Sequence, residues 1–158
     1  SACLVGSEMC IRDRDNLLKA GNTLTQRCFR TNKNEVIVKM NIEGMVDGQK
    51  AGLCHYSKSY AMVGVRQSGK DRNLEFQTNK EKITGPAIKG NKVWIKSVWG
   101  LDGKSQFSYS TDGRKFTPFG EVYQLEWGYY RGSRIGIYCF NNIADAGYID
   151  VDEFIYLY

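Results

Sequence analysis

Residues 35–42 read EVIVKMNI, and this stretch decides the fold class. Apolar side chains at positions 36, 38, 40 and 42 point one way if the stretch is extended, while Lys39 and Asn41 point the other way. A period of two places successive side chains on opposite faces of a β-strand. The stretch is therefore predicted to be a strand with one face against a core.

Shorter apolar runs with the same character follow along the chain, and none looks helical over ten residues. We predict strands at residues 24–30, 35–42, 52–56, 60–66, 73–78, 92–98, 105–110, 134–140 and 148–156. Four pairs ending in glycine lie between them and predict hairpins, because glycine adopts positive φ at little cost: Asp47-Gly48, Ser68-Gly69, Asp102-Gly103 and Asp112-Gly113. With no crossover helix to connect parallel strands, the sequence predicts an all-β fold. We expect a two-sheet antiparallel β-sandwich of jelly-roll or lectin type.

Composition limits the classes of function. The 158 residues suit one domain, and a hydrophobic content of 42% can fill its core. We expect a soluble chain without a membrane partner, because no run approaches the roughly 18 apolar residues of a membrane span. The net charge of +5 comes from Lys and Arg spread along the whole length, which argues against a nucleic-acid partner.

The cysteines do not indicate a compartment. There are five, at positions 3, 10, 28, 54 and 139, and no two have the C-x-x-C spacing. Neither a zinc site nor a disulfide framework is suggested. No secretory signal is recognisable, and the location of the protein stays open: it is expected in a bacterium, either in the cytoplasm or in the periplasm or secreted.

Residues 1–14, SACLVGSEMCIRDR, show neither strand alternation nor a helical stripe. The string resembles the translation of a sequencing adapter of the kind found at the ends of reading frames assembled from environmental DNA. We expect a non-native or disordered head at 1–14 and one sandwich module at 15–158, with an ordinary disordered terminus as the alternative.

Six blocks occur in an order that resembles the C-terminal domain of glycoside hydrolase family 43 (GH43) β-xylosidases and arabinofuranosidases. The most distinctive is QFSYSTDGRKFTPFG at 106–120. The others are NTLTQR (22–27), DGQKAGL (47–53), YAMVGVR (60–66), YYRGSRIGIY (129–138) and AGYIDVDEF (146–154). The resemblance implies a concanavalin A-like sandwich. It also implies missing first strands, because the family module opens with Phe- and Trp-rich strands and no counterpart precedes Asp15.

The resemblance also implies a partner and a site. In the family, the catalytic carboxylates lie on a five-bladed propeller that precedes the sandwich in the same chain, and the substrates are xylo- or arabino-oligosaccharides. A sandwich loop carrying two adjacent aromatic residues reaches the mouth of the propeller's active site. Tyr129 and Tyr130 occupy those positions, and Trp127 lies in the same loop. The alternative for this loop is simple packing between the domains.

Other residues give weaker signals. No catalytic residue is identified, because the E-x-D-x-x-E pattern of lectin-fold glucanases is absent. Asp150 and Asp152 are weak candidates for a calcium site, and no other cofactor is expected. Trp99, beside a turn, is a candidate for stacking on a sugar ring, whereas Trp94 is expected in the core. His55, the single imidazole, is interpreted as a structural or surface residue.

These observations favour a non-catalytic accessory module that packs on a catalytic propeller and helps to shape its pocket. An independent xylan-binding module or lectin is the alternative. The missing acid motif makes a self-sufficient hydrolase the least favoured reading.

Overall fold

The computed structural model describes residues 2–5, 24–128 and 132–158. These residues form thirteen strands and no helix, so no helix has the length and apolar character that a membrane crossing requires. The strands are β1 (Ala2–Val5), β2 (Leu24–Arg27), β3 (Asn34–Asn41), β4 (Gln49–Tyr56), β5 (Tyr60–Ser68), β6 (Asp71–Thr78), β7 (Lys82–Ala87), β8 (Lys92–Trp99), β9 (Lys104–Ser110), β10 (Thr117–Pro118), β11 (Tyr123–Gln124), β12 (Arg134–Asn141) and β13 (Tyr148–Leu157).

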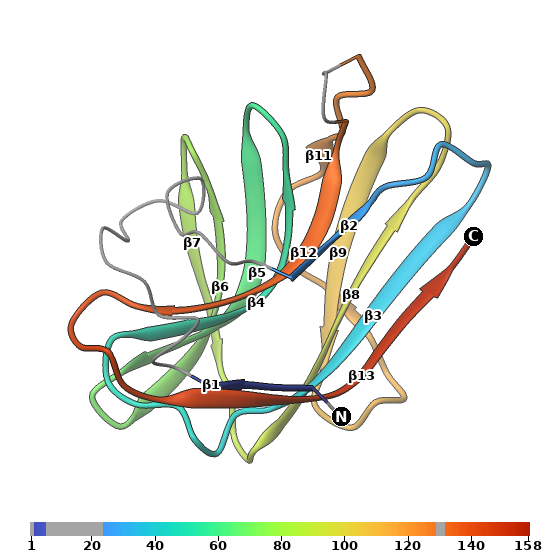
Figure 1. The fold of residues 1–158 in the computed structure, drawn as a ribbon. Helices are drawn as coiled ribbons and strands as arrows, with labels where there is room; N and C mark the ends of the chain where they lie inside the picture. Colours follow the sequence, from blue (N-terminus) through green and yellow to red (C-terminus); the bar gives the residue numbers. More distant parts are fainter. Residues whose placement is uncertain (1, 6–23, 129–131) are drawn as a thin grey trace.

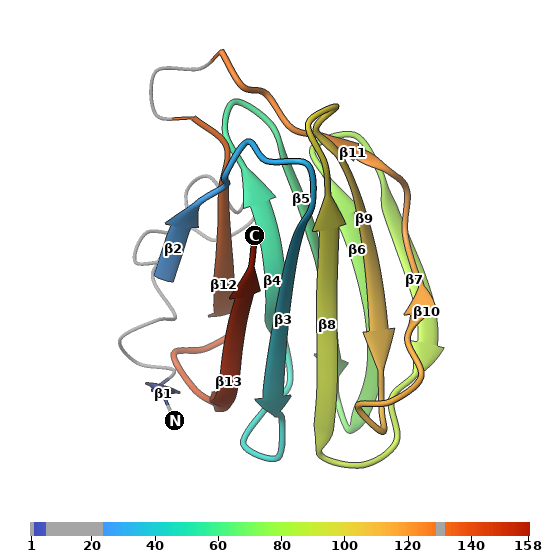
Figure 2. The same cartoon turned by 90° about the vertical axis from the view of Figure 1, so that its right-hand side faces the viewer.

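The strands form two sheets in which every pairing is antiparallel. One sheet has the order β1-β13-β3-β8-β9-β10, with β11 also paired to β9, and the other has the order β2-β12-β4-β5-β6-β7. Figure 1 shows β5, β6 and β7 on the left and β8, β3 and β13 on the right, and Figure 2 shows the same strands from the side. The predicted β-sandwich is confirmed.

The core lies between the sheets and is built by alternation within the strands. In β3 every second residue is buried, as the sequence predicts for positions 36, 38 and 40. Phe76 of β6, Phe107 of β9 and Trp99 of β8 are among its largest fully buried side chains. Residues from both sheets join in one cluster, so the sandwich is held together chiefly by apolar burial between its layers.

All nine predicted strands are present, with ends shifted by a few residues, and four others were not predicted. β7 contains Gly85 and Pro86 and lies at a sheet edge, where a residue without an N–H group is tolerated. β10 and β11 have two residues each, too few for an alternating pattern. β1 pairs with β13 although no strand was expected within residues 1–14. The predicted domain boundary near residue 15 lies outside the described residues.

Glycines at positive φ occupy all four predicted turns. Three of these turns join antiparallel neighbours: Gly69 between β5 and β6, Gly103 between β8 and β9, and Gly113 between β9 and β10. The prediction of a hairpin at Asp47-Gly48 is wrong, because this turn leads from β3 in one sheet to β4 in the other. There the Asn141 side-chain amide donates to the Asp47 carbonyl at 2.9 Å and holds the crossing segment.

Candidate functional site

Several connections gather at one end of the sandwich, shown at the top of Figure 1. This loop end comprises residues 28–33 between β2 and β3, 57–59 between β4 and β5, 100–103 between β8 and β9, and the described residues 125–128 and 132–133 between β11 and β12. Hydrogen bonds connect these segments. The Ser57 hydroxyl lies 3.3 Å from Glu126 Oε2, and the Leu125 amide donates to the Gly103 carbonyl at 2.8 Å.

The loop at 125–133 has a fixed base. The Ser133 hydroxyl accepts from the Glu126 amide at 2.9 Å and donates to the Glu126 carbonyl at 3.0 Å, so one side chain closes the base from both directions. The Ser133 carbonyl in turn accepts from the Cys28 amide at 2.9 Å. Tyr129 and Tyr130, the predicted substrate-proximal pair, lie outside the described residues, and their role stays a prediction.

Trp127 is the described aromatic residue of this loop. Its side chain is half-buried and packs against the core cluster, with the Arg30 guanidinium carbon 5.9 Å from the ring centroid. Its buried Nε1 has no hydrogen-bond partner among the described residues, although a buried indole N–H usually finds one. Trp127 therefore keeps its indole N–H inside the loop end, next to Gly103, and only part of its ring reaches the surface.

A hydrogen-bond network in the core lies beneath the loop end. His55 Nε2 is 2.7 Å from Ser97 Oγ and 3.0 Å from Ser105 Oγ, and His55 Nδ1 is 3.5 Å from Cys28 Sγ. Burial lowers the pKa of His55 to about 3, against a smaller opposing effect from a backbone hydrogen bond with Arg134. His55 is therefore neutral at ordinary pH.

This network is structural, although a serine beside a histidine can form a nucleophile–base pair. His55, Ser97 and Ser105 are all completely buried, so a substrate cannot reach them. The His55 ring stacks on Tyr123, with centroids 6.0 Å apart, and the Tyr123 hydroxyl lies 2.8 Å from Ser59 Oγ. The network thus joins the core to the loop end. Sequence spacing could not reveal it, because its members come from different strands.

The two tryptophans of β8 have the opposite placement to the one predicted. Trp99 is 2% exposed, donates from Nε1 to the Phe29 carbonyl at 3.1 Å and contacts the His55 ring edge-on, so the expectation of a sugar-stacking surface residue is wrong. Trp94 is half-buried on the outer face, with Lys39 Nζ 5.5 Å from its ring centroid. The reason is parity: Val93, buried between the sheets, fixes the odd-numbered residues of β8 as the inward ones.

The candidate metal ligands belong to no larger group of possible ligands among the described residues. Asp152 lies 3.8 Å from Lys39 Nζ, and the described residues contain no group of three or more His, Cys, Asp or Glu side chains that could hold a metal ion. Asp150 lies one strand position before the bulge that shifts the register between Val151 and Glu153. The structure therefore provides no observation in favour of calcium at Asp150 and Asp152.

The outer face of the six-stranded sheet carries a second cluster that the sequence analysis did not identify. Cys54, Tyr60, Met62, Tyr138 and Phe140 lie on this face because they alternate with the inward residues of their strands, and each is at most 5% exposed. Beside them the Glu75 carboxylate lies 2.5 Å from Lys50 Nζ, 3.5 Å from Arg66 and 3.6 Å from Lys82. Burial lowers the pKa of Lys50, and the adjacent Glu75 opposes this shift.

Two facing antiparallel sheets of this topology, with connections gathered at one end, define a concanavalin A-like β-sandwich domain. Residues 9–157 match the model of the β-xylosidase C-terminal concanavalin A-like domain. The chain therefore belongs to this family of GH43 C-terminal domains.

Known relatives agree with this assignment. The chain is 33% identical over 142 residues to a β-xylosidase of Formosa agariphila, covering 89% of this chain and 24% of that protein. A bifunctional GH43-CE protein of Bacteroides eggerthii is similar in structure, with a TM-score of 0.85 at 23% identity. The match covers 94% of this chain and 20% of the Bacteroides chain. A GH43 protein of Bacillus licheniformis has a TM-score of 0.69 at 18% identity, and the match covers 86% of this chain and 29% of the Bacillus chain. The chain thus spans less than a third of each relative.

Proposed function

We propose that this chain is the non-catalytic C-terminal accessory module of a β-xylosidase or α-arabinofuranosidase type of glycoside hydrolase. It packs on the catalytic propeller through the loop end and helps to shape a pocket for xylan and arabinoxylan oligosaccharides. The family and the enzymes that contain similar domains support the catalytic-domain partner. The observation that carries the placement of the contact is the half-buried Trp127 ring at the loop end, beside the Arg30 guanidinium.

The geometry of the loop base supports a positioning role. An interdomain contact gains affinity when its elements are already ordered, because less conformational entropy is lost on docking. The Ser133 clamp on Glu126 and the packing of Trp127 against the core supply that order. Buried aromatic and arginine side chains are the residue types that contribute most to interfaces, and Trp127 lies against Arg30.

A free-standing xylan-binding module requires exposed aromatic faces on which sugar rings can stack. Trp99 is 2% exposed, and the aromatic residues of the outer-face cluster, Tyr60, Tyr138 and Phe140, are 3–5% exposed. These residues give no support to the alternative function.

The experiment compares two tryptophan variants of the full-length enzyme that contains this module. Trp127→Ala removes the half-buried tryptophan of the loop end. Trp94→Ala is a matched control, because Trp94 is also half-buried and also lies beside a cation, but on the outer face of β8. We expect Trp127→Ala to lower kcat/KM for xylobiose about tenfold, equivalent to about 1.4 kcal/mol of transition-state stabilisation, with little change for Trp94→Ala.

A second pair of variants tests the predicted substrate-proximal tyrosines. Tyr129→Ala and Tyr130→Ala should lower the turnover of xylo- or arabino-oligosaccharides without changing the melting temperature of the enzyme. If the loop variants and Trp94→Ala all retain wild-type kcat/KM, the loop end does not shape the pocket. If instead the isolated chain binds xylo-oligosaccharides while turnover is insensitive to the loop, the independent binding module becomes the better function.

A further inference from the structure

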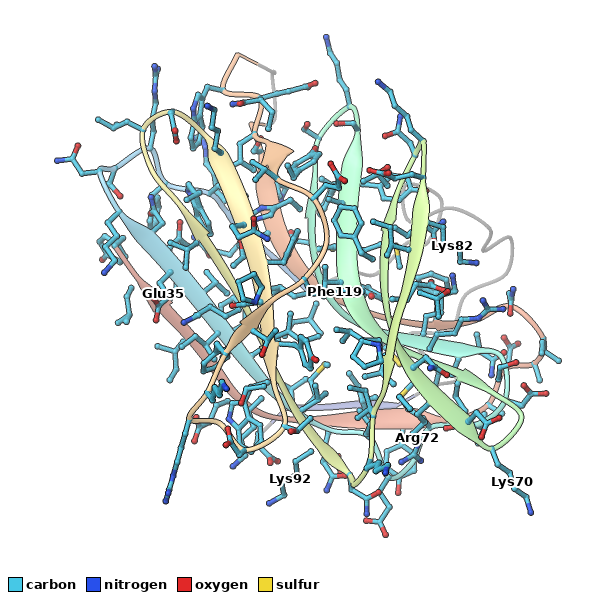
Figure 3. The ribbon with its side chains drawn as sticks, turned by 180° about the vertical axis from the view of Figure 1, so that it is seen from behind. Glu35, Lys70, Arg72, Lys82, Lys92 and Phe119 are labelled. Carbon is cyan, nitrogen blue, oxygen red and sulfur yellow. The ribbon has the colours of Figure 1, made fainter. Side chains whose placement is uncertain are left out.

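A groove lies at the end of the sandwich opposite to the loop end. It is formed by the turn between β5 and β6, the first residues of β6, and the connection between β7 and β8, and its volume is about 520 Å³. Its lining includes Lys70, Arg72, Lys89 and Asn91. Figure 3 shows Lys70 and Arg72 at this end of the molecule. The volume falls within the range of about 300 to 1,000 Å³ that is typical of small-ligand sites.

The Arg72 guanidinium is fixed by neutral acceptors alone. Its Nε donates to Gln67 Oε1 at 3.0 Å, one terminal nitrogen donates to Asn91 Oδ1 at 3.2 Å, and the other donates to the Glu43 carbonyl at 3.3 Å. No carboxylate of the described residues forms an ion pair with it. A guanidinium has five N–H donors, so two remain after these three bonds. Arg72 is therefore a preorganised cation whose charge is not neutralised.

The surroundings add positive charge. Lys70 and Lys89 are exposed on the two connections that border the groove, and Asp71 is the single carboxylate in the lining, so three cations exceed one anion by two charges. Another nearby carboxylate, that of Asp47, already accepts from the Gly69 amide at 2.6 Å. Gly90 leaves the border of the groove open, because a Cβ there would meet no atom within 4 Å.

A fixed guanidinium with two unused N–H donors matches the planar, two-oxygen geometry of a carboxylate. The groove also has room for more than a single anionic group. We propose that this groove binds a carboxylate-bearing sugar, such as a uronic acid residue on an acidic xylan chain. This ligand class rests on the proposed function in polysaccharide degradation. The groove gives the module a second, charge-selective contact with the polymer, remote from the loop end.

The test is isothermal titration of the 158-residue chain at low salt with a xylo-oligosaccharide that carries one glucuronic acid residue. A neutral xylo-oligosaccharide of equal length and inorganic phosphate are titrated in parallel. The groove variant is K70S/K89S, which leaves Arg72 in place. The matched control is K80S/K104S, because it removes the same charge from two exposed lysines outside the groove. A third variant, Arg72→Lys, keeps the charge and removes the planar fork.

We expect the acidic oligosaccharide to bind and the neutral one not to bind. K70S/K89S and Arg72→Lys should each weaken binding about tenfold, the factor that corresponds to about 1.4 kcal/mol, while K80S/K104S changes it little. Unchanged thermal unfolding confirms that each variant is folded.

Other results would overturn the proposal. Equal weakening by K70S/K89S and K80S/K104S would mean that net charge alone attracts the ligand. Equal affinity for the neutral oligosaccharide would exclude carboxylate recognition, and phosphate binding as tight as that of the acidic sugar would identify a general anion site. The absence of any binding would refute the site. Turnover by the loop-end variants is measured separately. The proposed function can therefore fail while groove binding persists, and groove binding can fail while the proposed function holds.

Discussion

The buried histidine makes the stability of the domain depend on pH in a calculable way. The pKa of His55 is about 3 in the folded state and 6.5 in an unperturbed chain, and burial is the largest cause. Below pH 6.5 the unfolded chain therefore binds a proton that the folded domain excludes. Stability is fully present above pH 6.5 and is lost as the pH falls toward about 3.

The size of the loss follows from the linkage relation. One pKa unit corresponds to about 1.4 kcal/mol, so His55 alone should lower the free energy of unfolding by about 2 kcal/mol between pH 7.5 and pH 5. Because His55 is fully buried, solvent does not screen this effect. Since it is the single histidine of the chain, no other imidazole contributes.

The assay is urea unfolding of the wild type and of His55→Asn at both pH values, followed by tryptophan fluorescence. The wild type should lose about 2 kcal/mol more than the variant, because carboxylates and the chain terminus titrate alike in both. Equal losses of unfolding free energy in the wild type and in His55→Asn would refute the assignment of this pH dependence to His55. As an independent check, the His55 ring proton shifts should stay constant from pH 7.5 to 5, and a titration midpoint near 6.5 would contradict the neutral assignment.

Three further predictions concern packing and charge. Gly64→Ala should destabilise the domain by about 3 kcal/mol in urea unfolding, because a Cβ there would overlap the Ala51 carbonyl; Gly128→Ala, in open space, is the control and should be neutral. Burial raises the pKa of Cys28 to about 12, so mass spectrometry after iodoacetamide treatment at pH 8 should find it unmodified in the folded domain and modified in urea. Glu75→Gln should cost about 2 kcal/mol in thermal unfolding, less than a fully buried ion pair, because two of its three cations are 43% exposed; an unchanged melting temperature would contradict this.

Much of the fold could be predicted because strands with one buried face repeat with a period of two. β3 is the clearest case, since its alternation in the sequence reappears as alternating burial. Three hairpins could also be predicted from local sequence, because their turns contain a glycine at positive φ. β10 and β11 are too short for such a signal, and the turn at Asp47-Gly48 shows that a local turn motif does not reveal which sheet receives the next strand.

The site could be predicted less well, because its geometry depends on contacts between distant segments. Trp94 and Trp99 were assigned to the wrong faces, although Lys92 and Lys96 mark the face of Trp94 as the outer one. The partners of His55, Ser97 and Ser105, lie 42 and 50 positions away along the chain. Arg72 had no distinguishing sequence context either, because its acceptors come from three separate segments.

The double hydrogen bond between Ser133 and Glu126 also bears on how such domains diversify. By joining the two ends of the loop directly, it separates the segment between them from the strands that follow, so a change of sequence or length there need not disturb β12. Closing a longer loop is inexpensive, since each doubling of length adds only about 0.6 kcal/mol. The sequence between these two residues can therefore vary while one unchanged scaffold carries it.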